Sequence, residues 1–389
     1  MLTPSIKLIN FKYSKNQLIK KKVNNLKKEN LIKKYPLLKS FTTNYKYSYS
    51  KKDLKKIKKG NNFKIIGMGG SILGTEAIYR FLNYKVKKKF IFINNLNSFV
   101  DKKRLKSKAT NIIISKSGNT LETILNSNLI INKKNKNVFI TENKNSYLQN
   151  LAQKLKAEIF EHKNYIGGRY SVLSEVGMLP AEIMGLKEKN FKRYNFLIKN
   201  KKFLNQLIIN VSSILKFIKQ GKYNSILLNY DKSSENLFKW YQQLVSESLG
   251  KKSKGILPII SSMPKDNHSL LQLYLDGPKN NFFTFFFVNE NNSEKINKSL
   301  LLKSHRYLHN KSLNKIIYSQ KIATENVFNK KNIPFRSFEI KKRSEQSIGE
   351  LFCFFTLETI LLGRALNVNP FDQPSVELIK KETKKILVK

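Results

Sequence analysis

Short apolar runs alternate with longer helix-like segments from residue 62 onward, and this alternation limits the folds open to the chain. In the first half the runs occupy 63–66, 90–93, 112–114 and 138–140, and the helix-like segments occupy 72–83, 120–132 and 146–156. Strands that alternate with helices pair in parallel through crossover connections. The pattern therefore predicts an open α/β sheet with helices on both faces.

The same pattern returns in the second half with different lengths. Helix-like stretches at 191–220, 234–249, 268–275, 293–330 and 344–366 alternate with apolar runs at 226–228, 255–260, 282–288 and 334–340. We therefore expect two doubly wound, mainly parallel α/β domains packed together. The expected divisions are a helical lead-in at 1–60, a first domain at 61–190, a second domain at 191–366 and a helical C-terminal segment at 367–389.

The chain is strongly basic, with a formal net charge of +48 from 74 Lys and Arg against 26 Asp and Glu. Such an excess would normally suggest a nucleic-acid or anionic-membrane partner. Nearly all of it is lysine scattered along the chain, whereas proteins that read nucleic acid usually rely on arginine forks and concentrate their charge. We interpret the charge mainly as a composition bias and expect no specific nucleic-acid partner, with a polyanion partner as the alternative.

Cysteine content and hydropathy bear on the compartment. The single Cys353 permits neither a disulfide framework nor a metal cluster built on cysteines. Residues 1–20 lack the continuous apolar segment of a signal peptide, and no stretch approaches twenty apolar residues without a charge. We therefore expect a cytoplasmic protein that makes no membrane contact.

Ligands of doubly wound sheets bind at the carboxyl ends of strands, which directs attention to the loop at 67–74. The loop is glycine-rich, but Ile72 occupies the third glycine position of a dinucleotide fingerprint, and Thr75 stands where a P-loop requires lysine. Backbone N–H groups and the hydroxyl of Ser71 remain as donors for an oxyanion. The alternative is that the glycines serve only the packing of a helix on a strand.

A second loop, after the run at 112–114, gathers hydroxyls around Gly118. Its polar residues are Ser115, Lys116, Ser117, Thr120 and Thr123. Thr120 is placed to cap a helix that begins at Leu121, but a capped turn explains only one or two of the four hydroxyls. Several donors at a helix N-terminus suit a dianionic phosphate monoester. Because no metal-binding acidic pair lies nearby, the loop suits holding a phosphate better than transferring one.

Four further segments follow in the sequence: GGRYS at 167–171, SESLGK at 246–251, DNHSLLQ at 266–272 and NPFDQPSVE at 369–377. Together with the loops above, and in this order, they resemble the signature segments of the phosphoglucose isomerase family over roughly residues 60 to 385. The resemblance implies two sugar isomerase domains and the interconversion of glucose 6-phosphate and fructose 6-phosphate through a cis-enediol(ate). It implies no metal and no organic cofactor, a role in glycolysis and gluconeogenesis, and a C-terminal segment that closes the active site.

The resemblance also implies individual roles. Glu247 corresponds to the catalytic base, and Arg169 to the arginine that stabilises the enediolate. His268 and Lys380 correspond to residues that assist ring opening. The implied substrate-binding residues are Gly70, Ser71, Ser115, Lys116, Ser117, Thr120, Thr123, Gln243 and Gln373.

In the family the histidine that corresponds to His268 reaches the active site of the neighbouring subunit, so the resemblance implies a homodimer. The other three histidines receive structural or surface roles. Two other functions stay open: a sugar isomerase domain protein that isomerises or only senses a different phosphosugar, and a basic protein associated with nucleic acid.

Overall fold

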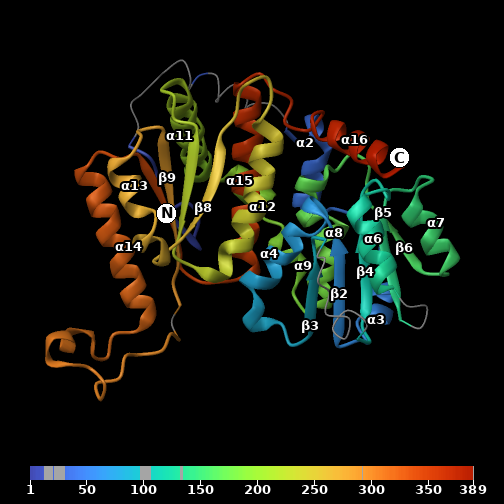
Figure 1. The fold of residues 1–389 in the computed structure, drawn as a ribbon, viewed down its shortest axis with the longest axis horizontal. Coiled ribbons are helices and arrows are strands. Elements are labelled where there is room, and N and C mark those ends of the chain that lie inside the picture. The colour runs from blue at the N-terminus through green and yellow to red at the C-terminus, as the bar shows by residue number, and fades with distance from the viewer. Residues whose placement is uncertain (13–20, 22–30, 97–106, 132–134, 291, 389) are drawn as a thin grey trace.

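The computed structural model describes residues 1–12, 21, 31–96, 107–131, 135–290 and 292–388. Two five-stranded sheets stand side by side, each covered by helices (Figure 1). One sheet is built from strands between residues 62 and 161, the other combines a strand at 6–9 with strands after residue 220, and the largest apolar core runs through both halves of the molecule. The predicted α/β class with mainly parallel sheets is confirmed.

The first sheet has the strand order β3-β2-β4-β5-β6, and all its pairs are parallel. The strands are β2 (Asn62–Gly67), β3 (Lys89–Ile93), β4 (Thr110–Ile114), β5 (Asn137–Thr141) and β6 (Glu158–Glu161). Its helices include α4 (Leu73–Phe81), α6 (Leu121–Ile130), α7 (Tyr147–Lys154) and α8 (Glu175–Ile183). Every residue of β4 and β5 is buried, as expected for parallel strands covered on both faces.

The second sheet has the order β1-β10-β9-β7-β8. Its strands are β1 (Ile6–Ile9), β7 (Asn224–Asn229), β8 (Leu257–Ser262), β9 (Asn281–Val288) and β10 (Phe335–Ile340). The principal helices are α11 (Lys201–Lys219), α12 (Glu235–Leu249), α13 (Leu271–Asp276), α14 (Leu313–Lys330) and α15 (Glu345–Ala365). Helix α12 packs against α4 of the first half and α15 of the second, which places it between the two sheets (Figure 1).

The expectation of a purely helical lead-in at 1–60 is wrong for residues 6–9. Ile6 and Leu8 are buried and alternate with the more exposed Lys7 and Ile9, which is the two-residue period of a strand. This strand, β1, pairs antiparallel with β10 at the edge of the second sheet. The lead-in also contains α2 (Leu31–Lys34), η1 (Pro36–Phe41) and α3 (Lys51–Ile57), while 13–20 and 22–30 lie outside the described residues.

Two long helices were predicted with the wrong limits. The helix expected at 293–330 begins only at Leu313, because Ser312 caps it by accepting a hydrogen bond from the Lys315 amide. The helix expected at 191–220 is divided into α10 (Tyr194–Lys199) and α11, because Asn200 ends one helix and caps the next. Polar caps inside a periodic pattern therefore determined the helix ends.

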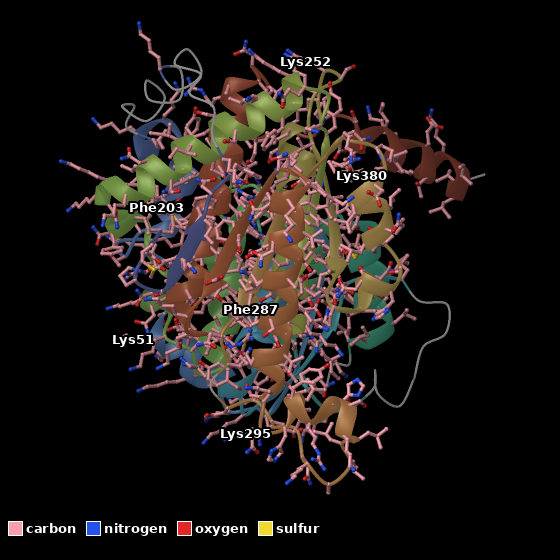
Figure 2. The ribbon with its side chains drawn as sticks, turned by 90° about the vertical axis from the view of Figure 1, so that its left-hand side faces the viewer. Lys51, Phe203, Lys252, Phe287, Lys295 and Lys380 are labelled. Atoms are coloured by element: carbon pink, nitrogen blue, oxygen red, sulfur yellow. The ribbon has the colours of Figure 1, made fainter. Side chains whose placement is uncertain are left out.

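The lysines spread over the molecule rather than gathering on one face. Exposed lysines at 51, 252, 295 and 380 lie around the outline of the molecule in Figure 2. At the C-terminal end, α16 (Val376–Val388) contains no buried residue and extends from the body of the protein (Figure 1). The part of the chain that precedes it, residues 369–373, contacts the candidate site.

Candidate active site

Helix α12 and a short turn from the first half bring a carboxylate and an arginine together. Arg169 lies in η4 (Gly168–Leu173), and its Nη1 donates to Oε2 of Glu247 at 2.9 Å. On α12, Gln243 lies one turn before Glu247 and donates through Nε2 to Oε1 at 2.9 Å. Glu247 remains 25% exposed, so both carboxylate oxygens are oriented while the group stays accessible.

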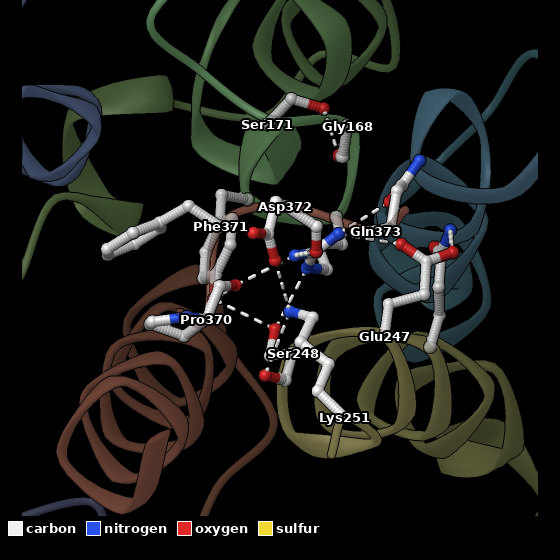
Figure 3. A network of polar contacts seen from close by, with 12 residues as sticks. Gly168, Ser171, Glu247, Ser248, Lys251, Pro370, Phe371, Asp372 and Gln373 are labelled. Atoms are coloured by element: carbon white, nitrogen blue, oxygen red, sulfur yellow. Dashed lines mark hydrogen bonds and ion pairs between the residues drawn. The ribbon is translucent and has the colours of Figure 1, made fainter. Parts of the chain in front are cut away.

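The guanidinium of Arg169 is only 3% exposed, and each of its five donor hydrogens has an acceptor. Nη1 also donates to Oε1 of Gln373 at 2.6 Å, and Nη2 donates to the carbonyls of Pro370 at 2.7 Å and Asp372 at 2.9 Å. Nε donates to the hydroxyl of Ser248 at 2.8 Å. These acceptors come from two separate parts of the chain, 247–248 and 370–373, which Figure 3 shows facing each other.

The hydroxyls of Ser248 and Tyr170 complete a directed chain of hydrogen bonds. Tyr170 donates its single hydrogen to the carbonyl of Pro370 at 2.8 Å, because a carbonyl can only accept. Ser248, 2.9 Å from the Tyr170 hydroxyl, must therefore donate to it while accepting from Arg169. Burial raises the pKa of Tyr170, so the phenol keeps its proton. The orientation of Arg169 is thus fixed on one side by the buried Ser248, whose hydroxyl is itself held by the buried Tyr170.

Residues 369–373, which we name the strap, cross the arginine and carry Gln373. Lys251, just past the end of α12, donates to the Asn369 carbonyl at 2.5 Å and lies 2.9 Å from Oδ1 of Asp372. Burial lowers the pKa of Lys251, an effect opposed by its hydrogen bond to Asp372. Burial alone would raise the pKa of Asp372, but the hydrogen bond and the charge of Lys251, together with the hydrogen bond from Asn369, lower this pKa.

The glycine-rich loop after β2 packs directly on the turn that holds Arg169. A Cβ on Gly70 would lie 2.1 Å from the backbone carbon of Gly168, so only glycine fits. Gly69 has φ +51, and a Cβ there would lie 2.6 Å from Nε2 of Gln243. Ser71 is 9% exposed in the following turn. Close packing explains these two glycines, and it also places the loop beside Gln243.

The hydroxyl-rich loop after β4 forms a compact turn. The hydroxyls of Ser115 and Thr120 lie 2.9 Å apart, and Gly118 adopts φ +69 against the side chain of Ser146. Thr120 precedes α6 as predicted, but its hydroxyl bonds to Ser115 rather than capping the helix. Oγ1 of Thr123 is buried and has no hydrogen-bond partner within the described residues.

Lys116 does not point toward these hydroxyls. Its ammonium donates to the Asn164 carbonyl at 2.8 Å and lies 3.5 Å from Oε1 of Glu142. Both partners belong to the segments that follow β5 and β6. Next to them, His162 is 1% exposed, with Nδ1 3.2 Å from the Lys163 carbonyl and Nε2 without a partner in the described ranges. Burial lowers the pKa of His162 to about 4.

We expect His162 to make folding sensitive to pH between 6.5 and about 4. Because its folded pKa of about 4 lies below the ordinary value of 6.5, the unfolded chain takes up the proton first as the pH falls. Its contribution is therefore complete above pH 6.5 and is lost as the pH approaches 4. Urea unfolding at several pH values should show a shallower loss for His162→Gln than for the unchanged protein. Parallel profiles of the two proteins would contradict this expectation.

Two of the predicted residues lie apart from this cluster. His268 ends the exposed turn η6 (Lys265–His268). Lys380 lies on α16, 58% exposed, and its ammonium is 2.6 Å from Oε1 of Glu377. Among the described residues, neither His268 nor Lys380 forms a hydrogen bond or ion pair with Arg169 or Glu247.

The sequence did not indicate several residues that complete the site. Ser248, Lys251 and Asp372 occur inside the segments quoted for the family resemblance, but no role had been assigned to them. Trp240, one turn before Gln243, donates through Nε1 to the carbonyl of Arg169 at 3.2 Å. The sequence places Trp240 on the same predicted helix as Glu247. That position alone does not distinguish a site residue from a core residue.

Two features are absent from the part of the chain that the structure describes. No helix there is both long and apolar enough to cross a membrane. Nor do three or more His, Cys, Asp or Glu side chains gather there in an arrangement that could hold a metal ion.

Comparisons with known proteins point to one family. The family model of phosphoglucose isomerase matches residues 33–257. A glucose-6-phosphate isomerase of Methanocaldococcus jannaschii is 34% identical over 342 residues, which cover 82% of each chain. One of Mycoplasmopsis pulmonis is 34% identical over 356 residues, or 84% of this chain and 82% of the relative.

A solved structure shares the fold. The glucose-6-phosphate isomerase of Chlamydia trachomatis superposes with a TM-score of 0.69 at 18% sequence identity, over 97% of this chain and 80% of its own.

Proposed function

This chain belongs to the phosphoglucose isomerase family and is an isomerase, and we propose that Glu247 is the base with which it interconverts glucose 6-phosphate and fructose 6-phosphate. The observation that carries the proposal is the position of Glu247, accessible to a ligand and held between Gln243 and Arg169. A base that serves this reaction must be oriented and must also reach the substrate.

In the proposed mechanism Glu247 removes the proton from C2 of the open-chain aldose and, after the O2 hydroxyl proton has passed to O1, returns the removed proton to C1 as the carbonyl forms at C2. Electrons from the C2–H bond form the C1–C2 double bond, and the carbonyl oxygen at C1 takes the negative charge of the enediolate. Glu247 becomes neutral in the same step. Its ion pair with Arg169 therefore weakens when a new anion forms on the sugar, and Nη1 can turn from the carboxyl to the enediolate oxygen.

The loop at 115–123 would hold the phosphate of the substrate. Its support is the set of hydroxyls at the amino end of α6 and the unpartnered, buried Oγ1 of Thr123. Ser71 and Gly70 would contact the sugar between this loop and α12. The ammonium of Lys116 would contact the phosphate directly only if its hydrogen bond to the Asn164 carbonyl broke. We therefore expect Lys116 to act on the phosphate through its positive charge rather than through a hydrogen bond.

We expect Ser117→Ala combined with Thr120→Ala to weaken substrate binding rather than catalysis. Each hydroxyl lost would remove a hydrogen bond to a charged group, worth about 1.5–3 kcal/mol, so KM should rise at least about tenfold while kcat changes little. The matched control is Thr43→Ala with Ser319→Ala, two exposed hydroxyls far from the loop in sequence. An unchanged KM in the variant that lacks the Ser117 and Thr120 hydroxyls would show that the phosphate binds elsewhere.

We further propose a homodimer in which His268 acts in the site of the neighbouring subunit and assists ring opening. Its exposed position at the end of η6 supports this, since the side chain is available to a second chain. Lys380 would assist the same step once the C-terminal segment closes on the site. Because the proposed reaction is reversible, we also propose that the protein serves both glycolysis and gluconeogenesis, and that it does so in the cytoplasm.

The test is an assay of the purified protein with fructose 6-phosphate, in which glucose 6-phosphate is coupled to reduction of a nicotinamide cofactor in buffer that contains a chelator. We expect turnover that survives chelation. A folded protein that binds fructose 6-phosphate without converting it would instead support the sensor function. Faster conversion of a different hexose 6-phosphate than of fructose 6-phosphate would show that the protein is an isomerase for that other sugar.

A further inference from the structure

We infer that Lys251 is a positioning residue for this reaction, which anchors the strap and so holds Arg169 and Gln373 in place for the base. The inference rests on the proposed function. The sequence predicted no role for Lys251. Within the described part of the chain, Lys251 forms no hydrogen bond with Glu247 or Gln373.

The ammonium of Lys251 uses all three of its donors. It lies 2.9 Å from Oδ1 of Asp372, 2.5 Å from the Asn369 carbonyl and 3.2 Å from the Ser248 carbonyl. The side chain is only 12% exposed, so this cation is held in the structure rather than in solvent. Lys251 therefore joins the end of α12, the helix that carries Glu247, to Asn369 and Asp372 of the strap.

The strap has a second anchor, Arg169. The carbonyls of Pro370 and Asp372 accept from Nη2, and the side chain of Gln373 accepts from Nη1. Within the strap, Nδ2 of Asn369 donates to Oδ2 of Asp372 at 3.0 Å. Figure 3 shows Lys251 and Asp372 meeting on the side of the strap that faces Ser248.

Asp372 has two roles that Lys251 keeps separate. Its carbonyl accepts from Arg169, whereas its carboxylate is paired with Lys251. Without Lys251, this carboxylate would lose its charged partner and keep only the hydrogen bond from Nδ2 of Asn369. Lys251 therefore fixes Asp372 in the position from which its carbonyl accepts from Arg169.

The effect should be seen in kcat. Arg169 interacts most strongly with charge that develops in the transition state, so its misplacement should lower kcat and kcat/KM together while KM changes little. Loss of a positioning contact displaces reactive groups without removing them, and a tenfold fall or more is the expected scale.

The experiment compares Lys251→Met with Lys254→Met. Lys254 lies three residues further on, is exposed and donates to the Leu366 carbonyl outside the strap, so it is matched in charge and neighbourhood. With fructose 6-phosphate we expect kcat of Lys251→Met to fall at least about tenfold with KM within about threefold, and Lys254→Met to remain close to the unchanged protein. Lys251→Arg should restore most of the activity, because it can still pair with Asp372.

Hydrogen–deuterium exchange supplies a readout that does not depend on activity. The peptide that covers the strap should exchange faster in Lys251→Met, while the peptide that covers α12 should not. If the unchanged protein failed to isomerise fructose 6-phosphate, the proposed function would fail, and the exchange data would still decide whether Lys251 anchors the strap. Unaltered strap exchange would overturn the inference.

A double-mutant cycle separates positioning from general destabilisation. In the Asp372→Asn background the ion pair with Lys251 is already lost, so Lys251→Met should lower kcat by a smaller factor than it does alone. Equal factors in both backgrounds would overturn the role of the pair. A lower urea midpoint with unchanged kcat in the folded Lys251→Met protein would show a structural residue only, and would also overturn the inference.

Discussion

Glu247→Gln should lower kcat at least about 10²-fold and leave binding of the phosphosugar largely intact. An amide cannot accept the proton from C2, and loss of a positioned acid–base group typically lowers the rate by 10²–10⁴-fold. The variant should still fold. The new amide can accept from Arg169 through its oxygen, and Oε1 of Gln243, which is buried without a partner among the described atoms, can accept from its nitrogen if the Gln243 amide turns over.

Turnover and binding should be measured separately, the second by calorimetry with a phosphosugar that is not converted. Glu235→Gln is the matched control, because Glu235 lies in the first turn of the same helix and pairs only with the exposed Lys239 at 2.9 Å. Near-normal turnover in Glu247→Gln would remove Glu247 from the mechanism. Loss of binding together with loss of turnover would indicate that Glu247 organises the site rather than acting as its base.

Arg169→Lys should lower kcat/KM by about 10²–10³-fold, the effect of removing one preorganised donor from a site where negative charge develops. Lysine supplies three donors from a single nitrogen, whereas the guanidinium supplies five in a planar fork. At least two of the five acceptors around Arg169 would lose their hydrogen bonds. Because these acceptors include buried atoms, each loss should also destabilise the fold by about 1–3 kcal/mol.

Activity of Arg169→Lys should therefore be measured well below its thermal midpoint, so that unfolding does not account for the loss. Arg80→Lys is the control, since Arg80 is half exposed and forms a single ion pair with Glu76 at 3.3 Å. Activity within a few-fold of the unchanged protein in Arg169→Lys would show that a point charge is sufficient. The bidentate geometry would then have no part in catalysis.

The fold could be predicted where a strand is buried on both faces, because burial imposes a continuous apolar run. That condition holds for β4, β5 and most of β9, all of which the sequence indicated. It fails for β1 and β6, which are short and only partly buried and carry charged residues. In addition, β1 pairs with β10, which lies far away in the sequence, and no local pattern indicates that pairing.

The site shows a similar limit. Glu247 and Gln243 share a helical face, so their proximity follows from a spacing of four residues. The contacts of Arg169 with Ser248 and with the strap come from segments far apart in the chain, and no spacing rule predicts which hydroxyl or carbonyl will meet a given N–H. Lys116 illustrates the same difficulty, because its ammonium is directed by Asn164 and Glu142 rather than by its own loop.

The edge strand β1 has a consequence for the order in which the protein can assemble during synthesis. Its residue Lys7 pairs with Glu339, 332 positions away, and its backbone pairs with β10. The strands of the first sheet, in contrast, all lie within residues 62–161 and can pair as soon as that part of the chain has left the ribosome. Strand β1 must therefore wait for β10, which is translated much later, and Ile6 and Leu8 stay uncovered until the two strands pair.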